Sequence, residues 1–130
     1  MPLDKNSIIK YRIERSNETA IEAAEAIANK HFHLAVNRIY YSIFYIVTAL
    51  AVKFDFSTSK HNQLLLWFNQ NFVNMSKVEK EIGRIYKDAF NRRLKGDYDD
   101  FINYSDEEID DYFNNMKKFI DRIKDIIASI

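Results

Sequence analysis

The segment at residues 34–54, LAVNRIYYSIFYIVTALAVKF, constrains this chain more than any other feature. Arg38 and Lys53 are its only charged residues, and its apolar side chains recur at the three- and four-residue steps of one helix face. The opposite face is apolar as well, so the segment needs neighbours on more than one side. Its uncharged run, residues 39–52, is shorter than the roughly 20 apolar residues that cross a bilayer. We therefore expect a buried central helix, either inside a bundle or at a dimer seam.

The rest of the chain also favours helices, because its 130 residues contain only two glycines and one proline, at position 2. Apolar periodicity predicts helices at about 4–29, 34–54, 60–72, 76–96 and 105–130. Ser76 with Glu79, and Ser105 with Glu108, match the capping box that opens a helix. The sequence thus predicts one all-α domain over residues 1–130, an antiparallel bundle of four or five helices.

Composition excludes several kinds of function. Lys and Arg together number 19, as do Asp and Glu, so no net charge draws the whole protein to nucleic acid or to an anionic membrane. The chain has no cysteine, which excludes disulfides, zinc-thiolate sites and thiol nucleophiles. Residues 1–16 lack the continuous apolar core of a secretory signal. We expect a cytoplasmic protein without membrane contact or specificity for DNA.

Charge is concentrated locally at residues 91–98, NRRLKGDY. Arg92, Arg93 and Lys95 lie at the end of a predicted helix, near Gly96, and guanidinium groups match the oxygens of a phosphate. This pattern predicts a phosphate-binding corner. The alternative, which these residues alone favour, is a solvated helix end with Arg93 paired to Asp97.

Arg38 and the histidines are the other candidates. Arg38 lies in an apolar helix and must reach a carboxylate, a carbonyl or solvent; an ion pair is favoured over a ligand contact. His61 begins the third predicted helix, as a capping or packing residue or, if a general base is needed, as that base. His31 and His33 are two residues apart and would point to opposite sides of a helix, so no metal site is expected. No glycine-rich phosphate loop or nucleophile elbow is present, and no cofactor is expected.

Four pieces of the sequence together resemble the HEPN domain (higher eukaryotes and prokaryotes nucleotide-binding). They are RIYYSIF at 38–44, SKH at 59–61, FNQNFV at 68–73, and Arg93-x-x-x-Asp97-Tyr98. The resemblance spans nearly the whole chain in order, and it is to the branch of the family with an Arg-x-x-x-Asp-Tyr motif. It implies a helical bundle that forms a homodimer, often encoded beside a minimal nucleotidyltransferase as a toxin–antitoxin pair.

Many members of that family are metal-independent ribonucleases, in which an arginine is followed four to six residues later by a histidine. The resemblance makes Arg93 the arginine that stabilises the phosphorane, but the residues at the histidine positions are Asp97, Tyr98 and Asp99. A tyrosine with a pKa near 10 and an aspartate beside arginines are poor proton carriers at neutral pH. Whether the protein is an enzyme therefore stays open at this point.

Two functions follow from these observations. The first is a dimeric nucleotide-binding or toxin-like protein that works with a minimal nucleotidyltransferase; the second is a divergent metal-independent ribonuclease acting at the dimer cleft. The candidate catalytic residues are Arg93, Asp97 and Tyr98. The candidate residues for binding a nucleotide or RNA are Arg92, Arg93, Lys95, Arg38 and His61.

Overall fold

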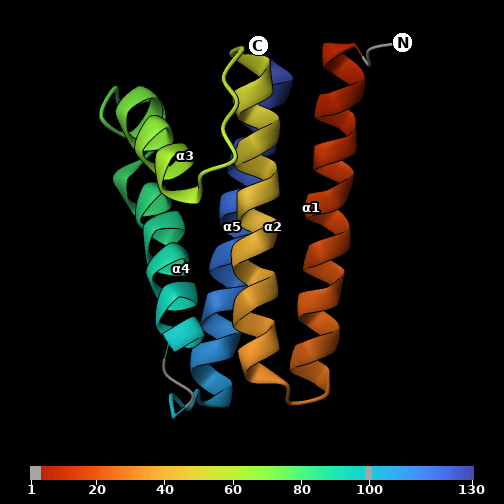
Figure 1. Ribbon diagram of the computed structural model, residues 1–130, viewed down its shortest axis with the longest axis vertical. Helices are drawn as coiled ribbons and strands as arrows, with labels where there is room; N and C mark the ends of the chain where they lie inside the picture. Colours follow the sequence, from red (N-terminus) through yellow and green to blue (C-terminus); the bar gives the residue numbers. More distant parts are fainter. Residues whose placement is uncertain (1–3, 99–100) are drawn as a thin grey trace.

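The structure is a computed structural model that describes residues 4–98 and 101–130, except for the side chains of Asp97 and Tyr98. It contains five α-helices and a π-helical turn, η1, that extends the third: α1 (Lys5–Ala28), α2 (Phe32–Lys53), α3 (His61–Phe68), η1 (Asn69–Val73), α4 (Lys80–Tyr98) and α5 (Asp106–Ser129). The described ranges contain no strand, so the predicted all-α class is confirmed. Successive long helices run in opposite directions, and the start of α1 and the end of α5 lie at the same end of the bundle (Figure 1).

Helix α2 is the centre of the bundle, because it packs against α1, α3, α4 and α5. Both of its faces are covered within the chain: Ile39 and Ile43 are buried, and so are Ile46 and Ala49. By length and composition alone α2 could cross a membrane, but 67% of its most apolar window is buried among the other helices. The predicted central helix therefore finds its second layer of neighbours inside one chain.

The two predicted capping boxes have different outcomes. Ser105 opens α5 as predicted: its hydroxyl accepts from the Glu108 backbone N–H at 3.1 Å, and the Glu108 carboxylate accepts from the Ser105 N–H at 3.3 Å. The prediction at Ser76 is wrong, because α4 begins only at Lys80 and Ser76 has a left-handed backbone with φ of 58°. The carboxylate expected to cap that helix, Glu79, instead accepts from Arg122 of α5 at 3.1 Å.

Three predicted boundaries also need correction. The central helix begins at Phe32, and the single helix expected at 60–72 changes to π-helical hydrogen bonding after Phe68. Helix α4 continues past Gly96 to Tyr98, since a glycine inside a helix costs only about 1 kcal/mol relative to alanine. The connection between α2 and α3 folds back along α2, which places the start of α3 beside the middle of that helix (Figure 1).

Candidate functional site

Two consecutive tyrosines in the middle of α2 form the base of the site. Tyr40 is fully buried and points toward α4, where its ring lies 6.1 Å from that of Phe90. Tyr41 is half-buried, and the two tyrosine rings meet edge to face at 5.3 Å. Consecutive helical residues point about 100° apart. Tyr40 therefore points into the core, and Tyr41 points to the surface next to it.

His61, the first residue of α3, contacts both tyrosines of the pair. Its Nδ1 atom lies 2.8 Å from the Tyr40 hydroxyl oxygen, and its ring stacks on Phe44 at 4.2 Å with an angle of 10° between the planes. The ring of Tyr41 meets that of His61 at 5.7 Å. Burial, and secondly the charge of Arg93, lower the pKa of His61, so the imidazole is neutral at pH 7.

The hydrogen bond to Tyr40 decides which nitrogen of His61 carries the proton. Burial raises the pKa of Tyr40, although Arg93 opposes that change, so the phenol keeps its hydrogen. A buried hydroxyl needs an acceptor, and among the described residues His61 Nδ1 is the acceptor within reach. We assign the Nε2–H tautomer to His61 on this ground. In this form Nε2 is a hydrogen-bond donor.

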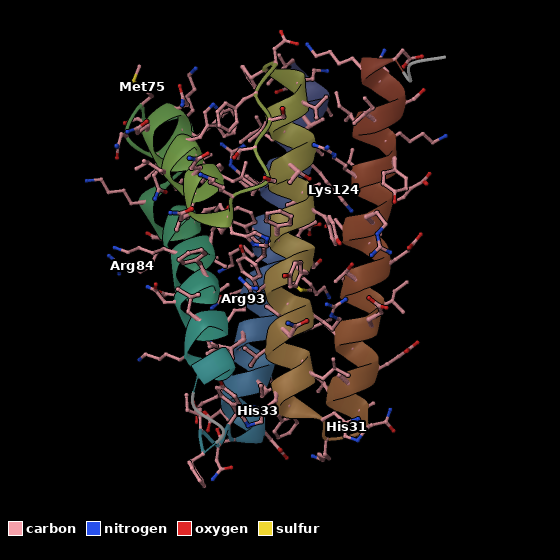
Figure 2. All side chains as sticks on the ribbon, viewed as in Figure 1. His31, His33, Met75, Arg84, Arg93 and Lys124 are labelled. Atoms are coloured by element: carbon pink, nitrogen blue, oxygen red, sulfur yellow. The ribbon has the colours of Figure 1, made fainter. Side chains whose placement is uncertain are left out.

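Two arginines flank the ring of Tyr41. Arg93 reaches from α4 toward α2 (Figure 2), and its Cζ lies 5.3 Å from the ring centres of both Tyr40 and Tyr41. Arg38, one turn before Tyr41 on α2, places its Cζ 5.3 Å from the same Tyr41 ring. Cations at this distance are attracted to the electron-rich face of an aromatic ring. We call these five residues the Tyr41 cluster: Arg38, Tyr40, Tyr41, His61 and Arg93.

Arg38 also makes the ion pair that its apolar surroundings predicted. Its Nη1 lies 3.3 Å from a carboxylate oxygen of Glu22 on α1, and its Nε and Nη2 donate to Asn37 Oδ1 at 2.9 and 2.6 Å. Glu22 is exposed, so the pair fixes the direction of the guanidinium more than it adds stability.

Arg92 and Lys95 lie outside this cluster. The Arg92 guanidinium stacks on the ring of Tyr112 in α5, with Cζ 3.4 Å from the ring centre. Lys95 lines a pocket with Arg92 between α4 and α5. The residues predicted to bind a nucleotide or RNA therefore lie in two places. Arg38, His61 and Arg93 come together at Tyr41, whereas Arg92 and Lys95 line the pocket between α4 and α5.

The predicted residues Asp97 and Tyr98 have backbones in the last turn of α4, one turn after Arg93. Their side chains lie outside the described part of the structure. Their predicted catalytic roles therefore remain predictions.

His33 is a site residue that the sequence reasoning missed. A pocket of about 410 Å³ beside the Tyr41 cluster is lined by Arg93, His33, Asn37 and Tyr104, and the Tyr104 ring lies 5.4 Å from that of His33. Positions 33, 37 and 41 recur every four residues on one face of α2, and this spacing was the available signal.

Comparison with known proteins decides the family. A family model described as HEPN domain matches residues 9–126 of this chain. The chain belongs to the HEPN family. The predicted resemblance is confirmed.

Several curated relatives match the HEPN chain over most of its length. A UPF0332 protein of Thermotoga maritima is 37% identical over 127 residues, which is 98% of this chain and 96% of the relative. Two proteins of Methanocaldococcus jannaschii, named "Putative toxin MJ0142" and "Putative toxin MJ0605", are each 32% identical. The alignments cover 86% and 94% of this chain, and 77% and 90% of the two relatives. Two relatives of this HEPN chain are thus named as toxins.

The Tyr41 cluster offers cations, aromatic faces and one neutral imidazole. Among the described side chains, those of residues 4–96 and 101–130, no group of three His, Asp or Glu is arranged to hold a metal ion. One guanidinium group can donate two parallel hydrogen bonds to the oxygens of a phosphate, and tyrosine and histidine rings stack on nucleobases. The arrangement is chemically suited to a ligand that carries both a phosphate and a flat ring.

Proposed function

We propose that this HEPN protein binds RNA or a nucleotide at the Tyr41 cluster. The observation that carries the proposal is the position of two guanidinium groups, Arg38 and Arg93, over one half-buried tyrosine ring. The net charge of zero supplies no general attraction for nucleic acid, so affinity has to come from a local site such as this one.

The same proposal includes two kinds of protein partner. The protein acts as a homodimer, and a minimal nucleotidyltransferase is its partner in a toxin–antitoxin-like module. The support is the HEPN family membership together with relatives that are named as toxins. Light scattering on the purified protein tests the dimer. Co-purification with a nucleotidyltransferase encoded beside it tests the module, and a protein that stays monomeric and alone contradicts this part.

Binding is tested by fluorescence anisotropy with a labelled single-stranded RNA and with ATP. Arg93→Ala should weaken binding by about tenfold or more, because a charged hydrogen-bond donor to phosphate is lost. Arg84→Ala is the matched control: Arg84 is on the same helix and its side chain is exposed and points away from the bundle (Figure 2). Equal affinities for wild type, Arg93→Ala and Arg84→Ala would contradict the proposed site.

A ribonuclease is the second candidate, and a specific contact favours it. His61 comes from α3 to the same pair of tyrosine rings that Arg93 contacts, so a histidine is present although none follows Arg93 in sequence. In such a reaction a base removes the proton of a ribose 2′-hydroxyl, whose oxygen attacks phosphorus while the 5′-oxygen leaves. The Nε2–H tautomer opposes a role for His61 as that base, so in this candidate His61 acts as a hydrogen-bond donor to the charge that develops on the phosphate.

Cleavage in EDTA distinguishes the two candidates. A nuclease should lose cleavage in both Arg93→Ala and His61→Gln, with circular dichroism showing that each variant is folded. If the folded wild type binds RNA without cutting it, the ribonuclease candidate is wrong and only the binding function remains.

A further inference from the structure

A second pocket, of about 420 Å³, lies on the side of α2 that faces α1. We call it the Arg12 pocket. Arg12 of α1, Tyr45 of α2 and residues 57–59, which lead into α3, line it. Phe44 also lines it, and the ring of Phe44 stacks on His61 at 4.2 Å. One aromatic ring therefore separates this pocket from the Tyr41 cluster.

The lining of the Arg12 pocket contains a cation and no carboxylate. Arg12 donates from Nη1 to the Thr48 carbonyl oxygen at 3.3 Å and makes no ion pair with any described acidic residue. Arg15 places its Cζ 5.1 Å from the centre of the Tyr45 ring, and its own partner is Glu18 at 2.9 Å. Arg12 is therefore the one charged residue among those described in the lining, and its guanidinium keeps donors for a ligand.

Residues 57–59 add hydroxyl groups on a segment that is held in place. Thr58 Oγ1 donates to Gln63 Oε1 at 2.8 Å and accepts from the Lys60 N–H at 3.1 Å. Ser57 and Ser59 are exposed, and their hydroxyls make no hydrogen bond with the described residues. A phosphate needs several donors around its oxygens. Arg12 and these hydroxyls supply them.

We propose that the Arg12 pocket is a second phosphate subsite, occupied by another phosphate of the ligand bound at the Tyr41 cluster. Tyr41 and Tyr45 are four residues apart on α2, which is about 6 Å along the helix axis. Stacked nucleotides advance by about 3.4 Å each. A ligand with a few linked phosphates or nucleotides spans the two sites. This subsite rests on the proposed function, since it receives a ligand already anchored at the first site.

The test compares oligouridylates of two lengths, because a dinucleotide has a single phosphodiester and cannot occupy both sites. Arg12→Ala should weaken binding of an octanucleotide at least about fivefold, and leave the dinucleotide unchanged. The slope of log K against the logarithm of the salt concentration should also become shallower by about one. Arg12→Lys should retain most of the affinity. Lys10→Ala, which removes an exposed cation from the same helix, should have no effect.

A second measurement uses wild-type protein and does not depend on how well a variant folds. The amide NMR signals of Ser57, Thr58 and Ser59 should shift with the octanucleotide and not with the dinucleotide. ATP added alone separates the two sources of phosphate: shifts with ATP assign the subsite to the phosphate chain of a free nucleotide, and shifts with the octanucleotide alone assign it to a polynucleotide.

The failure of this inference differs from the failure of the proposed function. If Arg93→Ala weakens binding, but Arg12→Ala behaves like Lys10→Ala and the three amide signals do not move, the second subsite is wrong and the first site stands. If Arg93→Ala has no effect, the proposed function is wrong, and the subsite falls with it.

Discussion

The Tyr40 hydroxyl lies 2.8 Å from His61 Nδ1, and this bond joins the buried core of the bundle to the half-buried site. A second buried tyrosine, Tyr86, has a hydroxyl that forms no hydrogen bond with the described residues. Both phenols are fully buried, but among the described residues only the Tyr40 hydroxyl has a hydrogen-bond partner.

This difference predicts opposite effects of the same substitution. Tyr40→Phe should lower the free energy of unfolding by about 1 kcal/mol, because it removes a satisfied hydrogen bond. Tyr86→Phe should be neutral or stabilising, because it removes a polar group that is buried without a partner. Urea denaturation of both variants measures the two values. Equal losses would contradict the assignment of the Tyr40 bond.

The neutral state of His61 predicts a pH dependence of stability. Burial first and Arg93 second lower its pKa in the folded protein, while in the unfolded chain it returns to about 6.5. The unfolded state then binds the proton more tightly, so the free energy of unfolding falls as the pH falls below about 6.5 and on through the folded pKa.

Denaturation at about pH 7 and pH 5.5 checks this sign. Wild type should lose more stability between the two values than His61→Gln does. The carboxylates with lowered pKa, such as Glu79 and Glu108, contribute at lower pH, where their unfolded forms titrate. A variant with the same pH dependence as wild type would contradict a depressed pKa at His61.

The two glycines also predict opposite effects. A Cβ added at Gly83 would lie 2.6 Å from Val73 Cγ2, so Gly83→Ala should destabilise the bundle by roughly 1–3 kcal/mol through overpacking. A Cβ at Gly96 meets nothing within 4 Å, and Gly96→Ala should stabilise helix α4 by about 0.5–1 kcal/mol. Thermal melts of both variants, and of Gly83→Ala with Val73→Ala, test the contact. The double variant should recover part of the loss.

Much of the fold could be predicted because the controlling signals are local. Residues 34–54 are apolar all round, which predicted a helix buried inside a bundle or at a dimer seam, and the structure packs it against four other helices of the chain. The Ser105 capping box is local too and formed as predicted. The equivalent pattern at Ser76 failed because tertiary contacts decided it: Val78 is buried, and Glu79 pairs with Arg122, which is 43 residues away.

The site was less predictable, because its residues meet only in three dimensions. Arg92 and Arg93 are adjacent in sequence and chemically alike, but one stacks on Tyr112 and the other faces Tyr40 and Tyr41. Their separation of about 100° around α4 becomes meaningful only when the neighbouring helices are placed. The same holds for His61, whose contact with the arginine site depends on where the connection after α2 places α3.

The most direct test of the proposed site is the affinity for single-stranded RNA when the Tyr41 ring, which both arginines contact, is removed. Tyr41→Leu keeps an apolar side chain but removes the aromatic face, and Tyr41→Phe keeps the face and removes only the hydroxyl. We predict that Tyr41→Leu weakens binding about fivefold or more, while Tyr41→Phe binds like wild type. A folded Tyr41→Leu variant that binds RNA as tightly as wild type would contradict the site.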